Sequence, residues 1–160
     1  TIPRFTYGFS LFGSYKGFDL NILLQGVAKV DGYLTGIESP FYSGGTIFKF
    51  HKDRWTTDNP NPNATFPRLY FGDSNNYRPS DFYLKSAAYL RLKNFQFGYT
   101  IPSLITKKFD ISSLRIYFVA ENLFTITSFW DGWDPESPPG TNGQFYPQVK
   151  NIGFGIDLKF

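Results

Sequence analysis

The sequence contains no cysteine and only one histidine, His51, among its 160 residues. Without cysteine, disulfides and thiolate metal sites are excluded. His51 lacks the H-E-x-x-H context of a zinc site, and a single imidazole leaves little room for a Ser-His-Asp set. Nucleophile-elbow, P-loop and dinucleotide-binding motifs are also missing. We therefore expect no metal, no cofactor and no catalysis: the protein is predicted not to be an enzyme.

Long apolar runs and charge clusters are missing as well. No stretch approaches roughly 18 consecutive apolar residues, the length of a transmembrane helix. The net charge is only +3, and the basic residues are scattered, so no nucleic acid partner is expected. The first residues, Thr1-Ile2-Pro3-Arg4, lack a signal-peptide pattern. An exported protein without a signal is either mature or a piece of a longer chain, and we favour the piece because the sequence predicts too few strands to close a barrel.

Aromatic residues, by contrast, are abundant. They make up 21% of the sequence, with 19 Phe and 11 Tyr, although the mean hydropathy is only −0.28. A soluble core does not need so many rings. A transmembrane β-barrel displays them to lipid, while its lumen side and outer loops keep the average polar.

The end of the chain carries the clearest strand pattern. Apolar side chains occupy every second position, whereas small or charged residues lie between them. Because a strand turns successive side chains to opposite faces, the apolar set is predicted to face lipid and to form part of a barrel wall. This set consists of Ile152, Phe154, Ile156, Leu158 and Phe160.

The same period marks five segments, which predict an all-β, antiparallel transmembrane barrel. The expected strands are residues 4–15, 18–28, 82–100, 114–127 and 148–160. A turn at Lys16-Gly17 and a short connection at 101–113, with a helical turn near Leu104–Lys108, alternate with long outer loops at 29–80 and 128–147. A switch of parity predicts a β-bulge near Lys93-Asn94. Five strands cannot close a barrel, so a membrane protein needs strands from further polypeptide.

Several motifs occur in an order typical of one family. Residues 88–102 (AYLRLKNFQFGYTIP) are similar to SYLRLKNLTLGYTLP. Residues 113–117 (SLRIY), followed by 121–125 (ENLFT), are similar to LRVYVSGQNLFTFT. Residues 131–136 (DGWDPE) and the ending at 154–160 (FGIDLKF) match the family's GYDPE loop and its final strand. The sequence therefore resembles the SusC/RagA-type TonB-dependent transporters of Bacteroidetes.

This resemblance implies a fold and a function. Residues 1–160 would be the C-terminal part of a barrel of about 22 strands; the family's plug domain and TonB box have no counterpart here. The whole protein would lie in the cell outer membrane, in contact with its lipid, and import oligosaccharides or peptides. Its partners would be a SusD-like lipoprotein and the TonB complex, the latter reached through the N-terminal part.

Aromatic residues in the two outer loops are candidates for substrate binding. The second loop contains Trp130, Trp133 and Asp134, and the first contains Trp55 and Tyr70. Rings beside carboxylates suit sugar recognition. The more common explanation is a tryptophan of the interfacial belt beside a solvated acidic turn.

Two further expectations concern the strands. The charged residues Arg115, Glu121, Asp157 and Lys159 are predicted on the polar, lumen-facing side, where charges of neighbouring strands can pair.

The alternative to a transporter is a soluble all-β carbohydrate-binding module. Such a sandwich would bury the apolar residues of the last strand against a second sheet.

Overall fold

The structure, a computed structural model, describes residues 2–34, 47–70, 75–137, 145–146 and 148–160. The chain divides into two compact units. The sheet unit comprises residues 2–30, 87–128 and 148–160, and the loop unit comprises residues 31–86 and 129–147. Within the described ranges, no helix combines the length and apolar character that crossing a membrane requires.

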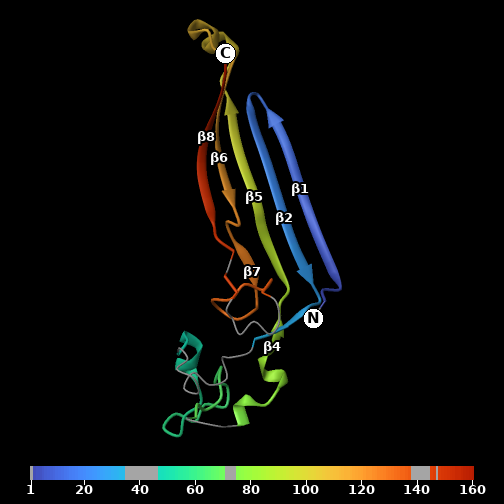
Figure 1. The fold of residues 1–160 in the computed structure, drawn as a ribbon, viewed down its shortest axis with the longest axis vertical. Coiled ribbons are helices and arrows are strands. Elements are labelled where there is room, and N and C mark those ends of the chain that lie inside the picture. The colour runs from blue at the N-terminus through green and yellow to red at the C-terminus, as the bar shows by residue number, and fades with distance from the viewer. Residues whose placement is uncertain (1, 35–46, 71–74, 138–144, 147) are drawn as a thin grey trace. The chain divides into compact units, whose positions relative to one another are not determined.

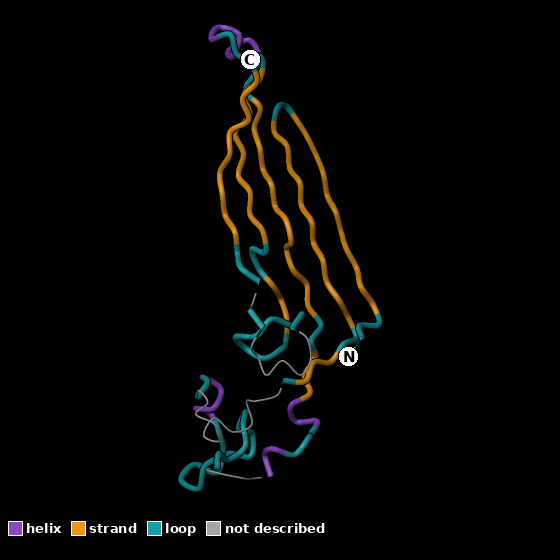
Figure 2. Tube along the Cα trace, in the orientation of Figure 1, coloured by secondary structure: helices purple, strands orange, loops and turns teal. Residues whose placement is uncertain are grey.

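The sheet unit is one antiparallel sheet in the order β1-β2-β5-β6-β8 (Figure 1). Figure 2, coloured by secondary structure, shows these long strands in orange; the helical turns of the sheet unit lie in the connection at 101–113. The strand β7 follows β6 along the chain and pairs with β5. The strands are β1 (Phe5–Tyr15), β2 (Phe18–Ala28), β5 (Tyr89–Thr100), β6 (Ser113–Glu121), β7 (Thr125–Thr127) and β8 (Asn151–Lys159).

A tight turn joins β1 to β2 at Lys16-Gly17, where the sequence predicts it. Both residues have positive φ, 49° and 87°, as the type I′ hairpin turn requires. The carbonyl of Gly17 also accepts a hydrogen bond from Thr100 N–H at 2.8 Å. The turn therefore fixes the register of the hairpin and ties it to the end of β5.

The predicted bulge lies in β5. Leu23 pairs with Asn94 and Leu24 with Leu92, so Lys93 is the extra residue. The chain beside it is also interrupted, because Asn122 adopts a left-handed conformation (φ 50°) and donates its N–H to the Lys93 carbonyl. The fourth segment, expected as one strand over 114–127, is therefore two strands, β6 and β7.

The third segment begins later than the sequence pattern indicates. The expected start at residue 82 falls in a 3-10 turn, η3 (Asp81–Tyr83), which Ser80 caps by accepting a hydrogen bond from Phe82 N–H. A short strand β4 (Leu84–Ser86) follows and pairs with β3 (Asp31–Tyr33). A helical turn forms here instead of the strand that the alternation of aromatic residues predicts, because Ser80 accepts a hydrogen bond from a backbone N–H at the start of the turn.

Two other helical regions complete the described elements. The loop unit contains η1 (Lys49–Asp53) and η2 (Asn75–Tyr77). The connection at 101–113 contains α1 (Ser103–Thr106) and η4 (Lys107–Phe109), where the sequence predicts a helical turn.

The loop unit has a core of its own. Leu34, Phe66, Tyr83 and Trp130 are buried together. His51 is fully buried beside them; its Nδ1 accepts a hydrogen bond from Phe48 N–H at 3.0 Å, and its ring meets the Phe66 ring edge-on. The only histidine of the sequence therefore has a structural role in this core.

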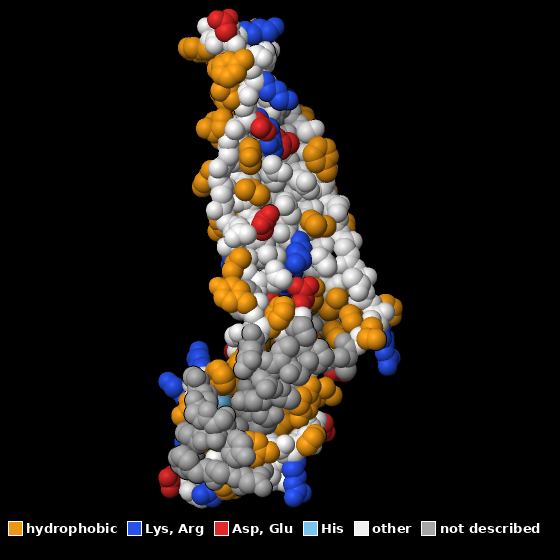
Figure 3. Space-filling view, in the orientation of Figure 1, with side chains coloured by type: hydrophobic (Ala, Val, Ile, Leu, Met, Phe, Trp, Pro, Cys, Tyr) orange, Lys and Arg blue, Asp and Glu red, His pale blue; other side chains and the backbone are white. Residues whose placement is uncertain are grey.

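The sheet unit has one apolar and one polar face. The pairing places Leu20, Phe97, Phe118 and Phe154 in one row across four strands, and Ile22, Phe95, Ala120 and Ile152 in the next. The opposite face carries the charged residues, and in Figure 3 blue and red side chains lie over the strands. Cross-strand pairing thus extends the alternation of the last strand over the whole sheet.

Candidate functional site

An open hollow of about 380 Å³ lies in the loop unit. This volume is at the lower end of the range for small-molecule sites, roughly 300–1,000 Å³. Three aromatic rings, one amide and one cation contribute to its lining, together with two prolines, an alanine and the buried Phe66. The rings, the amide and the cation belong to Trp55, Tyr70, Phe82, Asn61 and Arg68.

Local hydrogen bonds hold the floor of the hollow. Trp55 N–H donates to the Phe66 carbonyl at 2.9 Å, and Thr65 N–H donates to the Asp53 carbonyl at 3.1 Å. Phe66 is 1% exposed, and its ring packs against Phe50 with a centroid distance of 5.6 Å. The segments around residues 54 and 66 are thus clamped together over the core, and the floor is preformed.

The hollow brings together two of the predicted substrate-binding residues, Trp55 and Tyr70. Tyr70 is 43% exposed, and the guanidinium of Arg68 lies 5.2 Å from the centre of its ring. The Arg68 carbonyl accepts a hydrogen bond from the Asn76 amide at 2.8 Å. Among the described lining residues, Arg68 is the one charged group. Sequence reasoning missed Arg68 and Phe82, because nothing in the local pattern distinguishes them.

The predicted residues of the second loop have packing roles in the loop unit. Trp130 is 4% exposed, and the Lys85 ammonium lies 3.6 Å from the centre of its ring. Trp133 packs edge-on against Phe48 at 4.6 Å. Asp134 is 8% exposed and accepts a hydrogen bond from Glu136 N–H at 2.9 Å. These contacts give all three residues packing or turn roles, although the buried indole nitrogen of Trp130 has no hydrogen-bond partner among the described residues. Substrate contact by the three residues stays a prediction.

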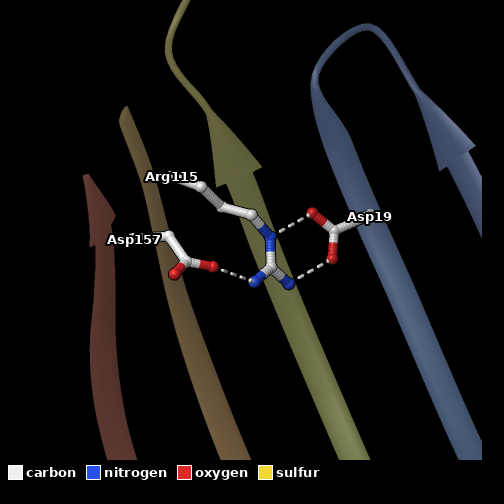
Figure 4. A network of polar contacts seen from close by, with 3 residues as sticks. All are labelled: Asp19, Arg115 and Asp157. Carbon is white, nitrogen blue, oxygen red and sulfur yellow. Dashed lines mark hydrogen bonds and ion pairs between the residues drawn. The ribbon is translucent and has the colours of Figure 1, made fainter. Parts of the chain in front are cut away.

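The polar face of the sheet unit carries a second notable group, the charge network drawn in Figure 4. Arg115 on β6 reaches across β5 and binds Asp19 on β2 through two hydrogen bonds, Nε to Oδ1 at 2.9 Å and Nη2 to Oδ2 at 2.6 Å. The other end of the guanidinium lies 3.7 Å from Oδ2 of Asp157 on β8. Pairing of Arg115 with Asp157 is what the sequence pattern allows, whereas Asp19 was not foreseen.

Glycine makes this crossing possible. A Cβ at Gly98 on β5 would lie 2.6 Å from both Arg115 Nη2 and Asp19 Oδ1. A similar arrangement occurs between β6 and β8, where the ring of Tyr117 covers Gly155. The guanidinium of Arg115 lies 4.7 Å from the centre of the same ring. A glycine that lies between long polar residues of the two neighbouring strands indicates such a crossing. It can be recognised in the sequence only when the order of the strands in the sheet is known.

The five predicted wall residues lie on β8 or directly after it. The four from Ile152 to Leu158 share the apolar face of the sheet, and Phe160 follows the last strand residue. All five are exposed, Phe154 by 82% and Ile156 by 68%. Contact of this surface with lipid stays a prediction.

Metal binding has no visible basis in the described part of the chain, where no three His, Asp or Glu side chains are grouped to hold an ion.

Comparison with known proteins gives no matching family model. A TonB-dependent receptor, P3, of Formosa agariphila is 28% identical over an alignment that covers 99% of this chain and 16% of that receptor. The TonB-dependent receptor SusC of Bacteroides thetaiotaomicron is 30% identical over 51% of this chain and 8% of its own length. A solved structure of the RagAB peptide importer, in its open-open state, superposes with a TM-score of 0.73 and 30% identity, covering 99% of this chain and 17% of that one.

Along almost its whole length, the chain is similar to part of a TonB-dependent receptor and of a RagAB importer chain, which supports a SusC/RagA-type TonB-dependent receptor. It spans about one sixth of the length of the relative and of the solved chain that it matches throughout. SusC/RagA-type receptors are outer-membrane proteins, and that is the location of this segment.

The motifs that carry the resemblance have clear places in this SusC/RagA-type segment. The longest motif contains β5, the central strand with its bulge. The second lies on β6, the left-handed residue Asn122 and the first residue of β7, and the last covers most of β8. The family prediction made from the ordered motifs rests on these relatives for its support.

Proposed function

We propose that this segment forms wall and outer loops of a TonB-dependent importer that carries oligosaccharides or peptides through the outer membrane. The observation that carries the proposal is the apolar face, which continues through five paired strands and is exposed in the sheet unit. A surface of this kind suits hydrocarbon, and the charged opposite face suits a water-filled lumen.

A closed barrel is part of the proposal. Among the described residues, β1 and β8 each have one edge without a strand partner. Unpaired backbone groups in hydrocarbon cost several kcal/mol each, so further strands must cover both edges. The resemblance to the family supports a barrel of about 22 strands around a plug, with β8 among the closing strands.

A soluble carbohydrate-binding module is not favoured. A sandwich would bury Phe154, Ile156 and Leu158 under a second sheet. All three are exposed, and the structural relative is an importer.

Partners are proposed from the family resemblance. The outer loops would meet a SusD-like lipoprotein, and the TonB complex would act through parts of the receptor outside this segment. The relatives are described as receptors and an importer, which supports a transport role and gives no support to catalysis. We propose no metal or cofactor for the segment.

The test uses the complete gene product in its native membrane. We expect an intact mass several times the 18.4 kDa of this segment, release from washed membranes only by detergent, and loss of growth on an oligosaccharide or peptide source when the gene is deleted. Recovery of the protein in aqueous buffer after membranes are pelleted would contradict the proposal, as would unchanged growth of the deletion strain on every such source that the parent uses.

A further inference from the structure

We propose that the hollow in the loop unit binds an acidic sugar, a pyranose that carries a carboxylate or sulfate group, as one residue of an imported oligosaccharide. In this assignment the sugar ring packs against the aromatic side chains that line the hollow, and Arg68 binds the carboxylate or sulfate group. The inference rests on the proposed import function and narrows its substrate class.

The walls of the hollow suit a sugar ring. Tyr70 and Phe82 are 43% and 41% exposed, and Trp55 is half-buried, so each has ring surface available to a ligand. Flat aromatic faces pack against the C–H faces of a pyranose. The floor is rigid, because Phe66 is buried between Phe50 and Tyr83. A preformed site loses little conformational entropy on binding.

Arg68 supplies the charge selectivity. It is exposed, it stacks over Tyr70, and no carboxylate pairs with it in the described part of the chain. A guanidinium binds carboxylate or sulfate oxygens through two parallel hydrogen bonds. No acidic residue occurs among the described lining residues, so these residues place no carboxylate against an anionic ligand.

A peptide fits this hollow less well. One common way for an extended peptide to bind is to add a strand to free backbone groups. Here the N–H groups of Trp55, Asn61 and Ala64 already donate to neighbouring carbonyls. Pro62 and Pro67 have no N–H to offer. The lining thus recognises rings and charge rather than a peptide backbone.

The experiment measures binding to the complete receptor, purified in detergent, by isothermal titration calorimetry. The probes are an oligogalacturonate, the same oligomer with its carboxylates methyl-esterified, a sulfated galactan oligomer and an acidic peptide. We expect the acidic sugars to bind about tenfold or more tightly than the esterified one. Separate titrations with the carboxylated and the sulfated oligomer decide which anion is preferred.

Variants locate the effect. Arg68→Gln should weaken binding of the acidic oligomer about tenfold and leave the esterified oligomer unchanged. The matched control is Lys52→Gln, which removes an exposed cation of the same unit that does not line the hollow and should change neither affinity. Equal affinity for the acidic and esterified oligomers, an unaffected Arg68→Gln variant, or tighter binding of the peptide would overturn the inference.

Uptake by cells separates this inference from the import function. A receptor that imports neutral glycans or peptides and does not bind acidic sugars leaves the import function standing and refutes the acidic-sugar site. A receptor that binds acidic sugars through Arg68 while its deletion changes no uptake refutes import and supports the site.

Discussion

At the scale of single residues, glycine positions decide which long side chains can cross a strand. Gly98 gives Arg115 a path over β5 to Asp19, and Gly26 on β2 lies under Tyr7, whose hydroxyl donates to the Tyr89 carbonyl at 3.0 Å. In each case a side chain from one strand bonds to the strand after next. These glycines therefore stabilise the sheet indirectly, because the absence of a Cβ leaves room for the side chains that cross them.

A methyl group at Gly98 should break the crossing. We expect Gly98→Ala to lower the free energy of unfolding by about 1–3 kcal/mol, because the new Cβ displaces Arg115 from Asp19 or forces backbone shifts. Gly153→Ala is the control, since its Cβ would make ordinary contact with Val119 at 3.5 Å. Denaturant titration of the complete receptor in detergent measures both, and equal losses for the two variants would refute the role of Gly98.

Adjacent residues of β8 test which face meets lipid. Phe154→Arg places a charge on the apolar face and should cost about 2–4 kcal/mol near the bilayer midplane. Gly153→Arg is the matched variant on the polar face, where a Cβ has room, and should cost clearly less. Folding titrations in lipid vesicles compare the two, and a larger cost at Gly153 would reverse the assignment of the faces.

At the scale of elements, the turn between β1 and β2 depends on its sequence. Gly17 has φ 87°, and a Cβ there would lie 2.8 Å from the Thr100 carbonyl. Gly17→Val should therefore destabilise the hairpin by about 1–2 kcal/mol or more. Lys16→Asn keeps a residue that tolerates positive φ and should be neutral. Refolding yield and the denaturation midpoint check both, and a stable Gly17→Val variant would contradict the turn type.

The strands were predictable because their signal is local. The alternation of period two locates β1, β2 and β8, and its switch of parity locates the bulge at Lys93. The break at Asn122 was not foreseen, because a left-handed residue between two strand-forming segments leaves the alternation almost intact.

The candidate site was less predictable, because burial in the loop unit depends on contacts between distant residues. Trp55 and Trp130 both occur in polar loops, yet one lines a hollow and the other is buried in the core. The Asp19–Arg115 pair joins residues 96 positions apart. It becomes visible only when β5 is known to lie between β2 and β6. The composition of the chain and the alternation of its residues do not tell which distant residues come into contact.

At the scale of the whole molecule, the two outer strands predict further pairing. In the complete receptor, amides of β1 and β8 that point away from β2 and β6 should be protected from hydrogen exchange for as long as those of β5, because hydrocarbon tolerates no open edge. Exchange measured by mass spectrometry on the receptor in lipid nanodiscs checks this. Rapid exchange confined to either edge would contradict a closed wall.

The pairing of β3 with β4 has one more consequence. Asp31 lies opposite Ser86, and Ala87 N–H donates to the Val30 carbonyl at 2.9 Å. Residues 31–86 therefore leave the sheet and return to it at neighbouring points. The core that supports the interior of this segment also includes Trp130, from the second loop. A segment exchanged between related receptors at these two ends therefore has to supply a matching partner for Trp130 of the second loop, while the strands of the sheet unit keep their own pairing.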